Sequence, residues 1–346
     1  MKRLVVKSPG KDLSTCQIEV ETDTPVPIPK SGQVLIKVIA SAINPSDYGS
    51  WFRCKPEQCP YAMGKEGSGI VVQLGGGMSA YLRSSIKIGT KVGFVNLKNK
   101  QGSYSEYVVA DLLGGVFVIP ETVPVENAAS FFVNPYTAIA ILDTVKQQHG
   151  STSFVHTAAA SQLGQMIVKL SLLEGVDVIN VVRREEQAEL LKSIGAKHVI
   201  VTTNDDESWK DELKIKMKEL NTTVAFDAVS GQSTGDMIDC LPKNGICFLY
   251  GGLAGKVTNI NPMDLIYYNK KIEGWLLTKW LGGNISTIPK LYSATNKVMS
   301  GLESDDGWSS SQFLDTTLEN AHKDLIYLVG SNKSTGKKLR IRISAP

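Results

Sequence analysis

The stretch "VHTAAASQLGQMIVKL", residues 155–170, joins an apolar run to a helical pattern through a turn of small residues. After the turn, apolar residues recur every three or four positions, which predicts an amphipathic helix. These residues are Leu163, Met166, Ile167 and Leu170. A strand, a tight turn and a helix in this order begin a nucleotide-binding βαβ unit. The first question is therefore whether this turn holds a phosphate group.

The turn aligns with the dinucleotide fingerprint G-x-G-x-x-G, and its three constrained positions hold Ala159, Ser161 and Gly164. Ala and Ser allow a tight turn and the approach of a pyrophosphate while φ stays negative, and Gly164 allows close helix–strand packing. The N–H groups and dipole at the helix start attract phosphate, and Ser161 adds a hydroxyl donor. We expect a phosphate site here. A turn that serves packing alone is the alternative.

The next strand carries information about the cofactor, because Arg183 and Arg184 follow its last residue, Val182. NAD sites place Asp or Glu at this point to accept from the ribose 2′-OH, whereas arginine binds a 2′-phosphate with its fork of donors. The sequence thus favours NADPH over NADH. The alternative is that the arginines cap the strand and pair with Glu185 or Glu186.

From about residue 125, apolar strand candidates alternate with helical patterns, which predicts a parallel sheet with helices on both faces. The strand candidates are 152–157, 176–182, 197–201, 222–228, 245–250 and 271–277. The helical patterns are 162–174, 185–194, 207–220, 232–241 and 262–269. We therefore predict an α/β fold whose doubly wound sheet is of the Rossmann type.

The chain before residue 120 reads as mostly strand, because β-branched and aromatic runs are separated by Gly and Pro. These runs are 33–44, 67–75, 91–97 and 104–111, and 76–90 reads as a loop. After about residue 280 come one helical pattern, 319–330, and a last strand, 337–343. We expect this tail to fold back on the first domain.

Composition excludes several classes of protein. The 346 residues include 37 Lys+Arg and 34 Asp+Glu, and a net charge of +3 is small for a nucleic-acid surface. No apolar run reaches the roughly 20 residues that span a bilayer. We expect a small-molecule ligand, no nucleic acid and no membrane span.

The chain has five cysteines, an odd number without a C-x-x-C pair. We expect reduced thiols in a reducing compartment. Cys54 and Cys59 share one predicted loop, but two cysteines do not complete a structural zinc site of four ligands. The start, "MKRLVVKSPG", lacks the apolar segment of a secretory signal. A cytoplasmic location is expected, and a mitochondrial one without an evident presequence is the alternative.

Seven short motifs occur in a fixed order. They are "NPSD" (44–47), "GKEGSG" (64–69), "NPYTA" (134–138), "AAASQLG" (158–164), "NVVRR" (180–184), "LYGGLAG" (249–255) and "EGWLLTKWL" (273–281). Over nearly the whole chain this set resembles the medium-chain dehydrogenase/reductase superfamily. Within the superfamily it is most similar to the zinc-free branch of quinone oxidoreductases and 2-enoyl thioester reductases.

The resemblance implies a GroES-like β-barrel catalytic domain made of residues 1–124 and the return segment 281–346. It also implies a Rossmann NADP-binding domain at 125–280 and an active cleft where the two domains meet. Members are commonly homodimers joined through Rossmann edge strands, which here implies the region near 271–281.

The resemblance also implies cofactor contacts by motif. Asn134 and Thr137 are expected near the nicotinamide, and Lys337 is expected to reach in from the last strand. The expected pyrophosphate contacts are Ala160, Ser161, Gln162 and Leu163, and the 2′-phosphate contacts are Arg183 and Arg184. The expected ribose contacts are Tyr250, Gly251 and Gly252, and the nicotinamide backbone contacts are Trp275, Leu276 and Leu277. The related reductases tend to have Phe-Trp-Leu at 275–277, so only backbone contacts carry over.

The zinc ligands of alcohol dehydrogenases in this superfamily do not carry over. Their positions hold Asn44, Lys65 and Val133, which form no zinc site. Without a Lewis acid, alcohol oxidation is not expected. Hydride addition to a conjugated C=C needs only donors for the carbonyl oxygen and a proton for the α-carbon.

The proton donor is open at this point. The related thioester reductases use a tyrosine eleven positions after the motif asparagine, and this chain has Lys55 there. Tyr48 is the substitute candidate, and a core or lid tyrosine is the equal alternative. Tyr61 is a weaker candidate, and Tyr136 is expected to pack beneath the cofactor.

We therefore predict an NADPH-dependent oxidoreductase that reduces an enoyl thioester, an enone or a quinone without zinc. The catalytic candidates are Tyr48, Asn44 and Lys65, where Lys65 either donates to an oxyanion or pairs with Glu66 or Asp47. The alternative is a non-catalytic NADPH-binding or scaffold subunit that retains the fold. A zinc alcohol dehydrogenase would need stoichiometric metal.

Overall fold

The computed structural model describes residues 1–77, 85–96, 101–202, 207–282, 288–304, 307–330 and 336–345. The chain divides into two compact units, Met1–Pro135 with Thr295–Pro346, and Tyr136–Ala294. The sequence placed its domain limits after residues 124 and 280, and these limits stay a prediction. Residues 78–84 of the predicted loop at 76–90 lie outside the described residues.

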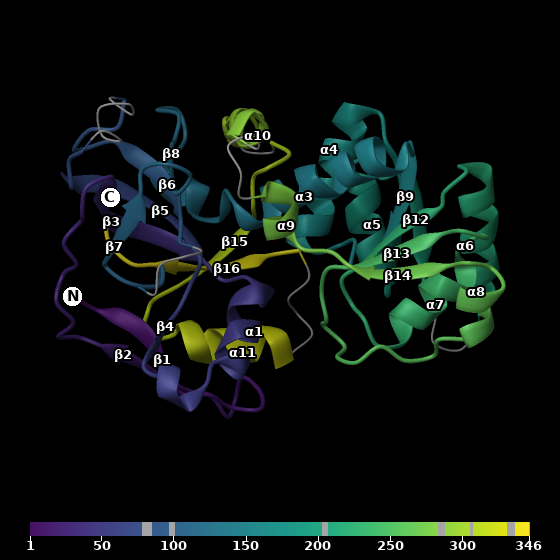
Figure 1. The fold of residues 1–346 in the computed structure, drawn as a ribbon, viewed down its shortest axis with the longest axis horizontal. Coiled ribbons are helices and arrows are strands. Elements are labelled where there is room, and N and C mark those ends of the chain that lie inside the picture. Colours follow the sequence, from purple (N-terminus) through teal and green to yellow (C-terminus); the bar gives the residue numbers. More distant parts are fainter. Residues whose placement is uncertain are drawn as a thin grey trace. The chain divides into compact units, whose positions relative to one another are not determined.

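The second unit contains one six-stranded sheet with the order β11-β10-β9-β12-β13-β14, in which every neighbouring pair is parallel (Figure 1). The strands are β9 (Ser153–His156), β10 (Asp177–Val182), β11 (His198–Val201), β12 (Val224–Asp227), β13 (Ile246–Leu249) and β14 (Lys271–Gly274). The chain leaves β9 toward β10 on one side and returns to β12 on the other, so the strand order reverses there. Ligands of doubly wound folds bind at such a reversal, outside the carboxyl ends of the strands.

Helices cover both faces of this sheet because side chains alternate along each buried strand. On β10, Ile179 and Val181 join the core beneath α6 (Ser208–Glu219) and α7 (Gln232–Cys240). Val182 instead joins the core beneath α4 (Gln162–Glu174) and α5 (Glu185–Ser193). The predicted doubly wound α/β fold is confirmed.

Several helices were not predicted from the sequence. They are α1 (Pro45–Arg53), α3 (Val133–Asp143) with a π-helical turn at Thr144–Gln148, α9 (Leu277–Leu281) and α10 (Ile288–Leu302). The predicted strand 271–277 ends at Gly274, and the predicted helix 262–269 is the short α8 (Pro262–Ile266). Within the described ranges, no helix has the length and hydropathy of a membrane-crossing segment.

The first unit is built on a β-rich framework. Its larger sheet has the order β15-β16-β3-β5-β6-β8, with β7 also paired to β3. These strands are β3 (Gln33–Ala42), β5 (Glu66–Leu74), β6 (Lys91–Val95), β7 (Tyr107–Asp111), β8 (Val116–Val118), β15 (Phe313–Thr316) and β16 (Lys338–Arg342). A smaller sheet contains β1 (Arg3–Ser8), β2 (Gln17–Glu21) and β4 (Tyr61–Ala62). Because β16 pairs with β3, the end of the chain lies beside a strand from its beginning.

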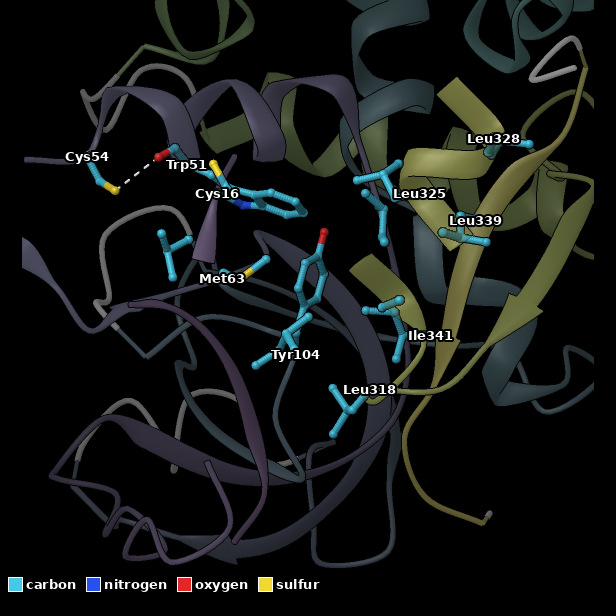
Figure 2. Packing of buried hydrophobic residues seen from close by; sticks show 14 residues of the cluster. Cys16, Trp51, Cys54, Met63, Tyr104, Leu318, Leu325, Leu328, Leu339 and Ile341 are labelled. Carbon is cyan, nitrogen blue, oxygen red and sulfur yellow. Dashed lines mark hydrogen bonds between the residues drawn. The ribbon is translucent and has the colours of Figure 1, made fainter. Parts of the chain in front are cut away.

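An apolar cluster joins elements that are distant in the sequence of the first unit (Figure 2). It contains Trp51 of α1, Met63 and Tyr104, together with Leu325 of α11 (Ala321–Gly330) and Ile341 of β16. Figure 2 shows the hydroxyl end of Tyr104 pointing away from the β-sheet toward the α1 side of the cluster. The packing therefore positions a polar group at the edge of an apolar core.

Candidate active site

The turn after β9 has the local geometry that phosphate binding needs. Ala158 adopts the left-handed region with a φ of 52°, and Ser161 has a φ of −65°. The Ser161 hydroxyl oxygen accepts from the Gly164 N–H at 3.1 Å, so Ser161 is the N-cap of α4. The N–H groups of the first helical turn have no partner within the helix itself. The turn that the sequence singled out thus presents a capped helix N-terminus at the reversal of strand order.

Glycines near the ends of the strands allow close approach of the backbone. A Cβ at Gly164 would lie 2.0 Å from the Ala159 carbonyl oxygen, and one at Gly251 would lie 2.4 Å from that of Ala228. A Cβ at Gly252 would meet nothing within 4 Å. Gly164 therefore serves helix–strand packing, as the sequence predicted, and the space beside Gly252 is open to a ligand.

Asp227, the last residue of β12, is fully buried and collects hydrogen bonds from uncharged donors. Its carboxylate accepts from five groups, and we name these residues the Asp227 cluster. The donors are Thr157 Oγ1 (2.6 Å), Val229 N (2.9 Å), Ser230 N (3.1 Å), Ser233 Oγ (3.2 Å) and Thr234 Oγ1 (2.7 Å). Ser230 has a positive φ of 63°, which a non-glycine residue adopts only when its surroundings hold it there. The cluster fixes the loop after β12 at the reversal of strand order.

Arg183 and Arg184 lie at the carboxyl end of β10, and both side chains are exposed. The Arg183 N–H donates to Gln187 Oε1 at 3.0 Å, which orients the residue at the start of α5. Among the described residues, the Arg183 guanidinium makes no ion pair with Glu185 or Glu186, the alternative that the sequence left open. The Arg183 side chain is thus accessible to a ligand.

Aromatic rings pack beside the ends of β12, β13 and β14. The Tyr250 ring lies 6.3 Å from that of Phe226 and 6.4 Å from that of Trp275, edge to face. Burial and the Asp227 charge raise the pKa of Tyr250. The backbone N–H of Trp275 donates to Leu249 O at 2.8 Å. A backbone contact of Trp275 with a cofactor would therefore have to use its carbonyl group. Leu276 is 54% exposed.

The remaining predicted contacts are on helices or at the last strand. Asn134 and Thr137 are both buried and lie one turn apart on α3, on the same face of the helix. Leu277 is the first residue of α9. Lys337 is exposed just before β16, whereas its neighbour Lys338 is buried.

The first unit holds a second polar site, formed by three side chains from different elements. Lys338 Nζ donates to Asn44 Oδ1 at 2.6 Å, and Asn44 Nδ2 donates to Glu66 Oε1 at 2.8 Å. Glu66 Oε2 accepts from the Phe132 and Val133 N–H groups at 2.9 and 3.0 Å. Lys338 Nζ also lies 3.9 Å from Glu66 Oε1. A buried lysine thus faces a buried carboxylate across Asn44.

Asp47 extends this site toward Lys65. Asp47 Oδ2 accepts from the Asn44 N–H at 2.8 Å and from Tyr104 Oη at 2.9 Å. Asp47 Oδ1 accepts no hydrogen bond within the described part of the chain and lies 3.8 Å from Lys65 Nζ. We name Asn44, Asp47, Lys65, Glu66, Tyr104 and Lys338 the charge cluster.

Burial controls the protonation of the charge cluster, because it disfavours the charged form of every group. It raises the pKa of Asp47, against the charge of Lys65, and that of Glu66, against the charge of Lys338. It lowers the pKa of Lys338 and that of Lys65. The carboxylates are therefore drawn toward their acid forms and the lysines toward their neutral forms. Groups perturbed by burial and by a specific charge partner are candidates for a functional site.

The other tyrosine and lysine candidates lie outside the charge cluster. Tyr48 is partly buried, and its ring lies 6.2 Å from that of Trp51 and 6.4 Å from that of Phe52. Burial raises the pKa of Tyr48 to about 12. Lys55 is exposed and pairs loosely with Glu57, with 3.9 Å between Nζ and Oε1. Inside the cluster, the predicted pairing of Lys65 with Asp47 is present. The Asn44 side chain contacts Lys338 and Glu66, which also belong to the cluster.

Tyr61 and Tyr136 differ in burial. Tyr61 is partly buried in β4, and burial raises its pKa. Tyr136 is completely buried at the start of the second unit. In the described ranges, no group of three or more His, Cys, Asp and Glu side chains is arranged to hold a metal ion.

Comparisons with known proteins place both sites in a family. A profile described as alcohol dehydrogenase GroES-like domain matches residues 30–126, and one described as zinc-binding dehydrogenase matches residues 163–294. A solved structure from Mesorhizobium loti, provisionally named an NADPH:quinone reductase, is 30% identical with a TM-score of 0.80. It covers 99% of this chain, and this chain covers 98% of it. The chain belongs to the medium-chain dehydrogenase/reductase superfamily.

Other members of the superfamily indicate the branch. The mitochondrial enoyl-[acyl-carrier-protein] reductase of Xenopus tropicalis is 28% identical over 80% of this chain and 77% of its own length. The human enzyme of the same name is 27% identical over 72% of this chain and 66% of its own length. The NADPH complex of an Escherichia coli quinone oxidoreductase has a TM-score of 0.80 over 98% of this chain and 99% of its own, at 20% identity. The predicted family and branch are confirmed.

Three residues of the two sites escaped the sequence analysis. Lys338 was missed because its neighbour Lys337 matched the family motif, and Tyr104 was read only as part of a strand run. Asp227 was not singled out, although a carboxylate that ends a buried parallel strand, here β12, was a usable signal. All three depend on contacts between distant segments.

Proposed function

We propose that the protein is an NADPH-dependent oxidoreductase that reduces an activated C=C bond or a quinone by hydride transfer without zinc. The observation that carries the cofactor half of this proposal is Arg183, an exposed arginine that follows β10 beside the capped turn 158–164. Arginine there suits a 2′-phosphate and would not be matched by the 2′-OH of NADH. The names of the relatives support the same cofactor and reaction.

The residues of the second unit fit this cofactor. The N-terminus of α4, with Ala160, Ser161, Gln162 and Leu163, is proposed to hold the pyrophosphate. Arg183 and Arg184 are proposed to hold the 2′-phosphate. Tyr250, Gly251 and Gly252 are proposed at the ribose, where the open space beside Gly252 supports the assignment. Asn134, Thr137, Trp275, Leu276, Leu277 and Lys337 remain proposed contacts on the nicotinamide side.

Bound NADPH supplies a hydride, and the residues of this chain must manage the charge and the proton. The charge cluster offers a partly exposed ammonium, which suits an acceptor that delocalises negative charge onto an oxygen. Enoyl thioesters, enones and quinones are such acceptors. Asn44 is fully engaged by Lys338 and Glu66, so its proposed role is to hold the cluster together.

Steady-state oxidation of NADPH at 340 nm tests this proposal with three acceptors: a 2-enoyl thioester, an enone and a quinone. Turnover with at least one acceptor is expected, together with loss of the C=C bond or formation of the hydroquinone. Tight NADPH binding without oxidation by any acceptor would support the alternative of a non-catalytic or scaffold subunit. The enoyl reductase and quinone reductase names among the relatives do not favour that alternative.

A homodimer through the edge strand is the proposed assembly. β14 pairs with β13 on one side and, among the described residues, with no strand on the other. Large apolar side chains are exposed near it. They include Met263 (43%), Ile266 (65%), Tyr267 (71%) and Tyr268 (52%). An unpaired edge beside exposed apolar groups suits a second copy of this chain. Light scattering should give twice the monomer mass. In Ile272→Pro, the measured mass should fall to that of the monomer.

A reducing compartment, the cytoplasm or the mitochondrial matrix, is the proposed location. All five cysteines are free, and four of them are buried. Free thiols in this number are typical of compartments that keep cysteines reduced. A fluorescent fusion to the C-terminus would distinguish the two compartments.

A further inference from the structure

The charge cluster contains two lysines, and only Lys65 is accessible. The Lys338 side chain is 5% exposed, and its ammonium is engaged by Asn44 and Glu66. The Lys65 side chain is 28% exposed, and Nζ donates to the Ser46 carbonyl oxygen at 2.6 Å. An ammonium has three N–H donors. Lys65 therefore has an N–H donor available to a ligand, whereas the Lys338 ammonium is buried and inaccessible to a ligand.

We propose that Lys65 is the catalytic residue that binds the developing oxyanion and returns the proton, and that Asp47 and Tyr104 are its positioning residues. This inference rests on the proposed function and names the groups that perform its acid chemistry. It goes beyond the family pattern, in which a tyrosine at the place of Lys55 donates the proton.

Asp47 attracts the Lys65 ammonium without accepting a hydrogen bond from it. Oδ2 is fixed by the Asn44 N–H and the Tyr104 hydroxyl, and Oδ1 lies 3.8 Å from Lys65 Nζ. At this separation the carboxylate attracts the ammonium, but the distance is too long for a hydrogen bond. Because Tyr104 is locked in the apolar core of Figure 2, the direction of the Asp47 carboxylate is fixed as well.

The reaction balances with Lys65 as the acid. With an enoyl thioester or an enone, a hydride from NADPH, which is thereby oxidised to NADP⁺, forms a bond to the β-carbon. The C=C π pair moves to the α-carbon and carbonyl, and the oxygen gains negative charge. The Lys65 ammonium stabilises this oxygen by a charge-assisted hydrogen bond. Its N–H bond then breaks, the proton passes to the α-carbon, and solvent restores the ammonium. One hydride and one proton are consumed in each turnover.

The protonation of Lys65 supports this assignment over Tyr48. Burial lowers the pKa of Lys65, Arg53 lowers it further, and Asp47 and Glu66 oppose the shift. Burial instead raises the pKa of Tyr48 to about 12. A general acid works best when its pKa lies near the working pH, and only the lysine moves in that direction. The lysine also brings a positive charge to the oxyanion, which a phenol lacks.

Lys65→Met should lower kcat by about 100-fold or more while NADPH binding is unchanged. Lys65→Arg, which keeps the charge, should recover part of the loss. Lys91→Met is the matched control, because the Lys91 side chain is 32% exposed, donates to the Glu121 carbonyl and pairs with the Glu121 carboxylate. The control should keep kcat within about twofold.

The double variant Lys65→Met/Asp47→Asn separates catalysis from charge balance. Lys65→Met alone leaves the buried Asp47 carboxylate without its cation and is expected to lower the melting temperature. The double variant removes both charges, so thermal stability should return while kcat stays at least about 100-fold low. If kcat returned with stability, Lys65 would only neutralise Asp47, and the inference would be overturned.

A pH profile tests the positioning role of Asp47. Activity that needs the Lys65 ammonium falls as pH rises through its pKa, and the Asp47 carboxylate raises that pKa. Asp47→Asn should therefore move the fall in kcat to lower pH, whereas a merely structural role would leave it unmoved. If wild-type protein does not oxidise NADPH with any of the three acceptors, the proposed function itself is contradicted. Active wild type with active Lys65→Met contradicts only this inference.

Discussion

The two units each bury a carboxylate at a strand end, but the carboxylate of the first unit also lies beside a buried lysine. Asp227 accepts five hydrogen bonds, two from backbone N–H groups and three from hydroxyls. In the charge cluster, Glu66 faces a buried lysine and Asp47 keeps one oxygen without a hydrogen bond. Among the described residues, only uncharged donors hold Asp227, whereas Glu66 accepts from three uncharged donors and also lies 3.9 Å from the Lys338 ammonium.

The difference indicates a structural role for the Asp227 cluster and a chemical role for the charge cluster. Fixed hydrogen-bond donors orient the Asp227 carboxylate, so the Asp227 cluster holds the loop beside the proposed cofactor site. A carboxylate that depends on a neighbouring ammonium shares its protonation with that neighbour. The charge cluster therefore has the property that an acid catalyst needs, and the predictions below test whether the two clusters behave as differently as they are built.

The largest effect is expected from Lys338→Met. It leaves Glu66 buried without its cation and should lower the free energy of unfolding by about 4 kcal/mol. Lys338→Met/Glu66→Gln removes both charges and should recover most of that loss in a denaturant titration. A double variant as unstable as the single one would show that the ion pair is not what holds the cluster.

Asp227→Ala should cost slightly less, about 3 kcal/mol, because it strands two buried N–H groups and three hydroxyls. Hydrogen exchange should rise at residues 227–234 and leave the first unit unchanged. Asp239→Ala is the control, since among the described residues the Asp239 side chain makes only a half-exposed pair with Lys214. Its cost should stay within about 0.5 kcal/mol. Uniform exchange across both units would contradict a local role.

Acid should weaken the second unit through His156. Burial lowers the pKa of His156 from 6.5 to about 4. Because the folded-state pKa lies below the unfolded one, its contribution is present above about pH 6.5 and is lost as pH falls toward 4. The loss should reach about 2 to 3 kcal/mol. In His156→Gln the free energy of unfolding should depend less on pH in this window, and an unchanged dependence would exclude His156 as the cause.

Gly164→Ala should destabilise by about 2 kcal/mol and weaken NADPH binding, because the new Cβ would meet the Ala159 carbonyl at 2.0 Å. Gly252→Ala is the matched control for stability alone, since its Cβ would meet nothing within 4 Å. The control should leave stability unchanged, and any loss of binding in it would place the ligand beside Gly252.

The sequence predicted the second unit well because its signals are local. Buried strands alternate with capped helices, so the predicted helix 162–174 coincides with α4, and the strands β9 to β13 lie within one or two residues of their predictions. Small residues in the turn and Arg183 after β10 are likewise visible in one short window.

The charge cluster could not be predicted in the same way. Its central hydrogen bond joins Lys338 and Asn44, which are 294 positions apart, and Tyr104 reaches Asp47 across 57 positions. Such contacts depend on the pairing of β16 with β3 and on the packing of α1, neither of which follows from periodicity. The Lys65–Asp47 pair, eighteen positions apart in two adjacent motifs, was the one part within reach.

The central claim is that the second unit holds NADPH through Arg183, and a titration tests it most directly. Nicotinamide fluorescence would be followed as wild type and Arg183→Ala are titrated with NADPH and with NADH. We predict that wild type binds NADPH at least about tenfold more tightly, a difference of about 1.4 kcal/mol, and that Arg183→Ala loses this preference. Equal affinity for the two cofactors in wild type, or a preference that survives in the variant, would contradict the account.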